Sequence, residues 1–368
     1  MKGSKHTLTL AFLIAIIFVI TFCSFGCGGT EPQEKNIDPL IKKWTIYNQS
    51  NSGLPSNEIS TIAVDNLGRV WVGTYNEGLA KLEGGSCIIY NTNNSGLSNN
   101  SINCIAVGTD NNIWIGTSNG LTKYDGKNWI VYNTENSPLP YRIIRVLTFD
   151  KNNLLWVGCG HFTAGGILSL NGSSWKLYTK DNSLLPSSII DVIHVDKNNN
   201  KWVGTAGGLV KIDDLNTWNV FTPSNSGLLK FGINAITTDN NNDVWIGARE
   251  WERLDYEHYY GLLQKFDGKN WVDFRPHPNG IYNLKAITSN RVAHIICDRF
   301  DYLLIATETE WRYPHNLSFF KNGIWKNLSD IANGLSINLF IRDMKLDKNG
   351  TLWLATQYGV ISIEYAYN

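Results

Sequence analysis

Residues 59–79 read Ile-Ser-Thr-Ile-Ala-Val-Asp-Asn-Leu-Gly-Arg-Val-Trp-Val-Gly-Thr-Tyr-Asn-Glu-Gly-Leu, and variants of this pattern recur along the whole 368-residue chain. The centre of each copy is a tryptophan, or a leucine in the sixth copy, and an isoleucine or valine stands twelve positions before it. The centres are Trp71, Trp114, Trp156, Trp202, Trp245, Leu304 and Trp353. The residues twelve positions earlier are Ile59, Ile102, Ile144, Ile190, Ile233, Val292 and Ile341. A repeat of this length, with short strands and no helical periodicity, predicts a β-propeller.

Each copy contains four strand signals. The first strand has the pattern of residues 59–65, and the second carries the tryptophan. The third begins at a Gly-Leu pair such as Gly78-Leu79, and the fourth carries Trp-x-x-Tyr, as in residues 129–132. β-Branched and aromatic residues between Asn, Asp and Gly turns favour short antiparallel strands. The predicted fold is therefore all-β, a seven-bladed β-propeller of four-stranded antiparallel blades.

The two ends of the chain predict how the ring closes. The last copy ends near Tyr365 with its third strand, whereas a fourth-strand sequence, residues 44–47, precedes the first copy. We therefore expect the N-terminal strand to complete the last blade and to remove the open sheet edges there. The predicted organisation is a signal peptide over residues 1–26, a flexible tether over 27–41 and the propeller over 42–368.

The first residues have the features of an export signal. Lys2 and Lys5 precede an apolar run, residues 8–22, which has the length of a signal-peptide core and is short for a membrane span. The following Ser-Phe-Gly-Cys sequence resembles a bacterial lipobox and predicts lipidation at Cys27. Ordinary cleavage without lipid and an uncleaved anchor are the alternatives. We expect an exported protein of the cell envelope, anchored to the outer membrane by lipid on its periplasmic or surface side.

Charge and cysteine usage exclude several functions. Lys and Arg together number 32, as do Asp and Glu, so no overall field favours nucleic acid. The four cysteines of the repeats occupy four different repeat positions and show no metal-binding spacing. We expect buried free thiols and no metal or cofactor, with one disulfide left open in an exported protein. These cysteines are Cys87, Cys104, Cys159 and Cys297.

An Asp-led turn after the first strand is interpreted as present in all seven copies. In the fifth copy, residues 239–243 resemble a calcium-binding loop, but they lack the glycine and the distal glutamate of an EF-hand. Because the Asp recurs from copy to copy, turn chemistry explains it better than metal binding.

The repeat is interrupted between the second and third strands of the third, fifth and sixth copies, and before the sixth copy. In an up-and-down blade these connections leave from the same end, so the irregularities gather on one face. The insertions around residues 249–260 and 308–315 combine aromatic residues with Arg, Glu and His. Such residues are suited to stacking on sugar rings and to binding hydroxyls or carboxylates. The alternative is that these loops only pack on one another.

Polar residues on the predicted first strands share one repeat position: Asn103, Arg145, Asp191, Asn234 and Arg342. They form either a pocket with the inserted loops or a solvated channel lining. His194 and His294 lie where other copies carry core residues, so we interpret them as core histidines. The candidate ligand-binding residues are Arg249, Trp251, Arg253, Tyr256, His258, Tyr259, Tyr260, Trp311, Arg312, Tyr313, His315, His161, Arg145, Asp191 and Arg342.

The pattern of residues 59–79 resembles the propeller repeats of two-component regulators. Asn-Ser-Gly-Leu segments at 51–54, 94–97 and 225–228 strengthen the resemblance. In that family such repeats form the periplasmic sensor portion of hybrid histidine kinases. The resemblance implies carbohydrate as a ligand class. We expect neither a kinase core nor a second propeller in this chain, so signalling is not carried over with it.

Three functions remain open. The first is a monomeric, non-enzymatic binding module that holds a glycan fragment or an envelope protein on the loop-rich face of the fifth and sixth blades. The second is a lyase or hydrolase acting on an envelope or extracellular substrate, although no HExxH or GxSxG motif frames its residues. Its candidates are His161, His258, His315, Glu250, Glu252 and Glu310. The third is a scaffold that recruits a partner through its rim.

Overall fold

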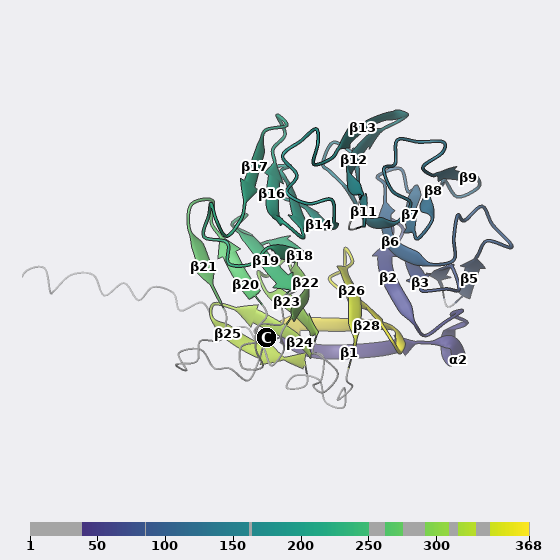
Figure 1. Ribbon diagram of the computed structural model, residues 1–368. Coiled ribbons are helices and arrows are strands. Elements are labelled where there is room, and N and C mark those ends of the chain that lie inside the picture. Colours follow the sequence, from purple (N-terminus) through teal and green to yellow (C-terminus); the bar gives the residue numbers. More distant parts are fainter. Residues whose placement is uncertain are drawn as a thin grey trace, which may run out of the picture. The chain divides into compact units, whose positions relative to one another are not determined.

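The computed structural model describes residues 39–84, 86–161, 164–249, 262–274, 291–308, 316–328 and 339–367. Residues 39–367 form one compact unit. The strands of this unit make seven separate four-stranded sheets, and every strand pairing is antiparallel (Figure 1). The predicted seven-bladed propeller is confirmed.

The blades follow one another in chain order, and within blades 1 to 6 each strand pairs with the next. Blade 1 consists of β2 (Ile59–Val64), β3 (Val70–Thr74), β4 (Leu79–Glu83) and β5 (Ser86–Tyr90). Blade 2 consists of β6 (Ile102–Val107), β7 (Ile113–Thr117), β8 (Gly120–Tyr124) and β9 (Trp129–Tyr132). Blade 3 consists of β10 (Ile144–Phe149), β11 (Leu155–Gly160), β12 (Gly165–Asn171) and β13 (Ser174–Tyr178).

The second half of the ring repeats this arrangement. Blade 4 consists of β14 (Ile190–Val195), β15 (Lys201–Thr205), β16 (Gly208–Ile212) and β17 (Trp218–Phe221). Blade 5 consists of β18 (Gly232–Thr238), β19 (Val244–Arg249), β20 (Leu262–Phe266) and β21 (Trp271–Asp273). Blade 6 consists of β22 (Arg291–Cys297), β23 (Leu303–Glu308), β24 (Asn316–Lys321) and β25 (Ile324–Asn327). Blade 7 contains β26 (Ile341–Leu346), β27 (Leu352–Thr356) and β28 (Gly359–Tyr367), and its fourth strand is β1 (Pro39–Tyr47).

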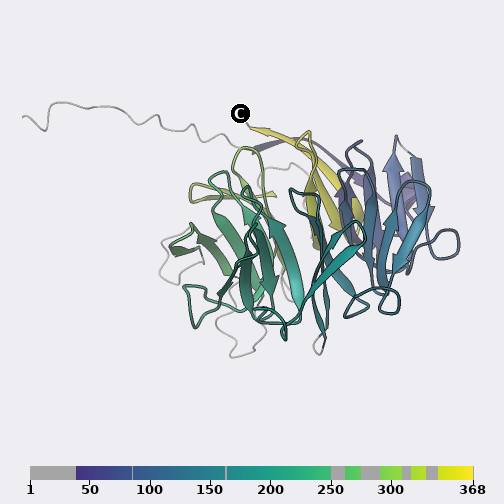
Figure 2. The same ribbon diagram turned by 90° about the horizontal axis from the view of Figure 1, so that it is seen from above.

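The N-terminal strand closes the ring as predicted. β1 pairs with β28 along its length, with Pro39 opposite Tyr367 and Tyr47 opposite Val360. Both views show purple β1 beside yellow β28 (Figures 1 and 2). The first strand of each blade contacts the first strand of the next blade, and β26 contacts β2 in turn. The first and last blades are therefore joined. A short helix, α2 (Gln49–Ser52), follows β1.

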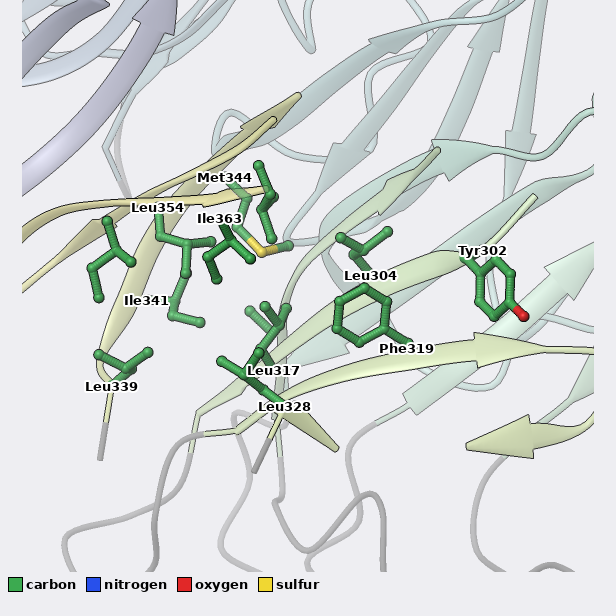
Figure 3. Packing of buried hydrophobic residues seen from close by; sticks show 13 residues of the cluster. Tyr302, Leu304, Leu317, Phe319, Leu328, Leu339, Ile341, Met344, Leu354 and Ile363 are labelled. Carbon is green, nitrogen blue, oxygen red and sulfur yellow. The ribbon is translucent and has the colours of Figure 1, made fainter. Parts of the chain in front are cut away.

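The hydrophobic core lies between blades. Within the described chain the buried apolar residues form seven clusters, and each combines two neighbouring blades. Between blades 6 and 7, for example, Leu304 and Phe319 meet Ile341 and Leu354 (Figure 3). Each blade therefore depends on its neighbours for burial of its apolar surface, which is typical of repeat architectures.

The Asp-led turn joins the first two strands of a blade. In blade 1, Asp65 Oδ1 accepts hydrogen bonds from the backbone N–H groups of Leu67 and Arg69, and Oδ2 accepts one from Trp71 Nε1 at 3.0 Å. Blades 3, 4, 5 and 7 repeat the Asp–Trp bond. The turn interpretation is confirmed for the blades that carry the Asp.

The expectation that all seven copies carry this Asp is wrong. In blade 2, Gly108 stands at the end of the first strand, and Asp110 lies inside the turn. In blade 6, Asp298 Oδ1 accepts the turn N–H groups, but Leu304 replaces the tryptophan that would reach Oδ2. The turn forms in both cases because its backbone hydrogen bonds persist.

Candidate functional site

The first strands of all seven blades line a cavity of about 860 Å³. At one end its lining extends beyond these strands, to Tyr75 and Ser118 in the connections between second and third strands and to Ile143 just before β10. No residue of the Asp-led turns belongs to the lining. The cavity therefore reaches the face that carries the connections from second to third and from fourth to first strands. We call this side the insertion face.

A β-bulge shapes the mouth of the cavity in every blade. The pairing register between the first and second strands shifts just after the isoleucine or valine that stands twelve positions before the centre of each repeat. The extra residue is the one that follows this isoleucine or valine, the position at which the sequence carries its polar set. Five of these side chains donate to a backbone carbonyl oxygen of the next blade. The pairs are Ser60 with Ile102, Asn103 with Ile144, Arg145 with Ile190, Asn234 with Val292, and Arg342 with Ile59.

Arg145 connects blades 3 and 4 at the mouth. Its Nη2 lies 2.5 Å from Asp191 Oδ1, and its Nε donates to the carbonyl oxygen of Ile190 at 3.2 Å. The Asp191 side chain is 6% exposed and that of Arg145 is 35% exposed. A carboxylate buried to this extent is stabilised by the guanidinium and the bonds it makes. Two predicted site residues therefore lie together, and both line the cavity.

Arg342 occupies the corresponding position where blade 7 meets blade 1. Its Nη2 lies 2.5 Å from Glu58 Oε2, and its guanidinium carbon lies 4.7 Å from the ring centre of Tyr75 and 5.1 Å from that of Phe340. Both aromatic rings therefore lie within cation–π distance of the guanidinium. Arg342 Nε is buried and has no hydrogen-bond partner among the residues that the structure describes.

His161 lies on the insertion face, in the long connection of blade 3. Its imidazole stacks on Tyr141, with ring centres 5.8 Å apart and planes inclined by 17°. Its backbone N–H donates to the carbonyl oxygen of Ala164 at 2.7 Å. His161 is not among the residues that line the cavity.

Except for Arg249, the remaining predicted site residues belong to segments outside the described ranges. Arg249 is the last residue of β19, where its backbone pairs with Gly232. The others stay predictions: Trp251, Arg253, Tyr256, His258, Tyr259, Tyr260, Trp311, Arg312, Tyr313 and His315. The same holds for Glu250, Glu252 and Glu310.

Asp343 lies deeper in the cavity and also joins blades 7 and 1. Its Oδ2 accepts from Thr61 Oγ1 at 2.8 Å and from the N–H of Ile62, and its Oδ1 lies 3.3 Å from Lys345 Nζ. Burial opposes ionisation of this carboxyl, but Lys345, His294 and the hydrogen bonds outweigh it and hold its pKa below the usual range. The Asp343 carboxyl is therefore ionised, and both of its oxygens contact groups of the propeller itself.

The thiols near the cavity have the properties of core residues. Burial raises the pKa of Cys104 and of Cys297, and it raises that of Cys159 to about 12. A thiol that stays protonated at neutral pH is a poor nucleophile and a poor metal ligand. The four described cysteines are free. In the described part of the chain, no group of three His, Cys, Asp or Glu residues could hold a metal ion.

His194 and His294 are not core histidines as expected, because both are half-buried and line the cavity. Burial lowers the pKa of His194 to about 4, against the opposing effect of Asp196, and its Nε2 lies 3.0 Å from Thr238 Oγ1 of the next blade. The imidazole is therefore neutral at physiological pH and bound to a neighbouring strand.

Sequence reasoning missed Tyr75. The residue follows β3 in a connection of ordinary length, so a search for interrupted repeats passed over it. Comparison of equivalent positions in the repeats could have identified Tyr75, because other blades carry small or polar residues there: Ser118, Ala206 and Gln357. Tyr75 is 44% exposed and lines the cavity.

Comparison with known proteins agrees with the repeat and the fold. The two-component regulator propeller profile matches residues 53–76 and 96–119. No curated protein sequence matches the chain. The extracellular domain of a hybrid two-component system from B. thetaiotaomicron superimposes with a TM-score of 0.67 at 20% identity, over 87% of this chain and 41% of that one. The chain thus spans less than half of that relative.

Two enzymes share the fold at lower identity. Virginiamycin B lyase from Staphylococcus aureus superimposes with a TM-score of 0.63 at 16% identity, over 87% of this chain and 98% of the lyase. An ancestral GH74 enzyme gives a TM-score of 0.63 at 16% identity, over 88% of this chain and 46% of that one. At these identities the likeness establishes the fold and not the activity.

Together, the sheets and the closed ring define this protein as a seven-bladed β-propeller with a polar cavity along its first strands. Segments of its first two blades, residues 53–76 and 96–119, match the two-component regulator propeller repeat. Across the described ranges, no helix has the length and apolar character needed to span a membrane.

Proposed function

We propose that this chain is a non-enzymatic propeller of the cell envelope that binds a ligand on its insertion face. The ligand is a glycan fragment, or else a protein partner, and the binding surface includes the inserted segments of blades 5 and 6. The observation that carries the proposal is the cavity of about 860 Å³ that reaches this face. Polar and aromatic groups surround its mouth, as they do in sites for hydroxyl-rich ligands.

The chemistry at the mouth supports binding over catalysis. Arg145 is paired with Asp191 and Arg342 with Glu58, and the imidazole of His161 stacks on Tyr141. Side chains held in this way present fixed hydrogen-bonding groups, as a binding site requires. Location at the envelope is part of the proposal and rests on the signal-like N-terminus with Cys27 as its lipidated residue.

A lyase or hydrolase is the second candidate. One observation favours it, namely that the chain aligns with 98% of the virginiamycin B lyase and with only 41% of the sensor domain. Its acid–base residues would come from His161, His258 and His315 with the neighbouring glutamates. It predicts substrate turnover that is lost in His258→Ala.

The experiment compares the wild-type protein with a Trp251→Ala/Trp311→Ala double variant in calorimetric titrations with xylo-, manno-, gluco- and galacturono-oligosaccharides. We expect heat of binding from wild type and none from the double variant, with both unfolding at the same temperature. Binding that persists in the double variant would remove blades 5 and 6 from the site. Absence of binding to every sugar would refute the glycan proposal, whereas release of a new product would favour the enzyme.

The proposed lipid anchor is tested separately, by fractionation of cells that express the protein. Cys27→Ser should move the protein from the membrane fraction to the soluble fraction.

A further inference from the structure

We propose that Tyr75 is a stacking platform for one pyranose ring of a neutral glycan, at the part of the cavity mouth formed by blades 7, 1 and 2. The inference rests on the proposed function and adds to it a ligand class and a binding position. This position lies in the described part of the chain, outside the insertions that sequence reasoning selected.

Arg342 packs over the ring of Tyr75. The guanidinium of Arg342 lies over the ring, 4.7 Å from its centre, and Phe340 lies on the guanidinium as well. Arg342 is fixed in turn by the carbonyl oxygen of Ile59 and by Glu58. Tyr75 as a residue is 44% exposed, so the contact with Arg342 leaves part of it accessible to a ligand. A rigid aromatic face loses little conformational freedom when it binds a ligand.

Core packing does not explain the ring. Tyr75 belongs to none of the hydrophobic clusters that the described residues form, including the two that involve blade 1. It nevertheless lines the cavity. An exposed aromatic ring at the mouth of a polar cavity is typical of a site that takes a partly apolar ligand, and the C–H face of a pyranose provides such a surface.

Hydrogen-bonding groups suited to sugar hydroxyls line the same cavity as the Tyr75 ring. Ser60, Asn103 and Ser118 line the same cavity from blades 1 and 2. Ser118 Oγ lies 3.1 Å from Ser101 Oγ and 3.4 Å from Asn103 Oδ1. Hydroxyl and amide groups both donate and accept, as the hydroxyls of a sugar do.

The charges at the mouth favour a neutral sugar over an acidic one. Arg342 is paired with Glu58, Arg145 with Asp191, and Lys345 with Asp343. An acidic sugar would have to displace one of these carboxylates and leave it near its own charge. In the described lining, therefore, every Arg and Lys already has an acidic partner.

The test uses the full-length protein in calorimetric titrations with neutral xylo-, manno- and gluco-oligosaccharides and with galacturono-oligosaccharides. Tyr75→Ala and Tyr75→Leu should each weaken binding of the neutral sugar about tenfold, and Tyr75→Phe should keep it within about twofold, because the ring face provides the contact. The matched control is Tyr358→Ala, which removes a tyrosine that is 46% exposed on the same face but does not line the cavity. It should leave the affinity unchanged.

The outcomes separate this inference from the proposed function. If neutral sugars bind equally well to wild type and to Tyr75→Ala, the stacking platform is wrong and the glycan-binding function stands. Equal losses in Tyr75→Ala and Tyr358→Ala would also refute it, as would tighter binding of the galacturono-oligosaccharide. If no sugar binds the wild-type protein, the stacking platform fails together with the glycan form of the proposed function. Leucine keeps the bulk of the side chain without the aromatic face, so agreement between the Leu and Ala variants excludes a packing defect as the cause.

Discussion

The shifted pKa of His194 makes the folding stability of the propeller depend on pH. In the unfolded chain a histidine takes up its proton near pH 6.5, whereas burial lowers the pKa of folded His194 to about 4. Between these values the unfolded state binds more protons than the folded state. The contribution of His194 to the free energy of unfolding is therefore fully present above about pH 6.5 and is lost as the pH falls toward 4.

We predict that the free energy of unfolding contributed by His194 falls by about 2 kcal/mol between pH 7 and pH 5. Urea unfolding at the two pH values measures it. The control is His194→Gln, which has no group titrating in this window and should show a smaller loss between the two pH values. An identical pH dependence in the two proteins would contradict the assignment.

At the scale of the strand and its turn, the tryptophan of the second strand links the Asp-led turn to the core. Trp202 is 3% exposed, packs between blades 4 and 5, and donates from Nε1 to Asp196 Oδ2 at 3.0 Å. Burial of Asp196 opposes its ionisation, but hydrogen bonds from Asn200 and Trp202 outweigh this and lower its pKa. One residue thus stabilises both the turn and the contact between blades.

We predict that Trp202→Ala lowers the free energy of unfolding by about 3–5 kcal/mol, since it leaves a cavity between two blades. Trp202→Leu should cost less, because blade 6 accommodates Leu304 at the equivalent position. Urea unfolding of the three proteins gives the comparison. A melting temperature of Trp202→Ala that equals that of wild type would contradict the prediction.

The strands and their turns could be predicted from the sequence because both depend on local chemistry. Residues 59–79 alone specify the alternation and the turn residues of a blade. The hydrogen-bond partners of Arg145, Asn103 and Arg342 could not be predicted in this way. Their partners are carbonyl oxygens of the next blade, brought near by a bulge and by packing between sheets. The insertions were predicted as the candidate site because of their length. Tyr75 lies in a connection of ordinary length, so this criterion did not identify it.

For the whole molecule, closure of the ring depends on nine residues at its N-terminal end. β1 supplies the outer strand of blade 7, and Trp44 and Ile46 pack against the cluster between blades 6 and 7. β1 begins at Pro39, opposite Tyr367. Pro39 therefore lies at the end of blade 7 opposite the insertion face.

We predict that a chain beginning at residue 38 keeps the melting temperature of the full protein, whereas one beginning at residue 48 does not fold to a stable monomer. Without β1, the edge of β28 loses its pairing partner and becomes a site for association with other chains. Thermal unfolding and size-exclusion chromatography test both chains. Adding a peptide of residues 39–47 should restore the monomer by strand addition, and a peptide with the same composition in scrambled order should not. A stable monomer from residue 48 onward, without the peptide, would show that packing between blades closes the ring without this strand.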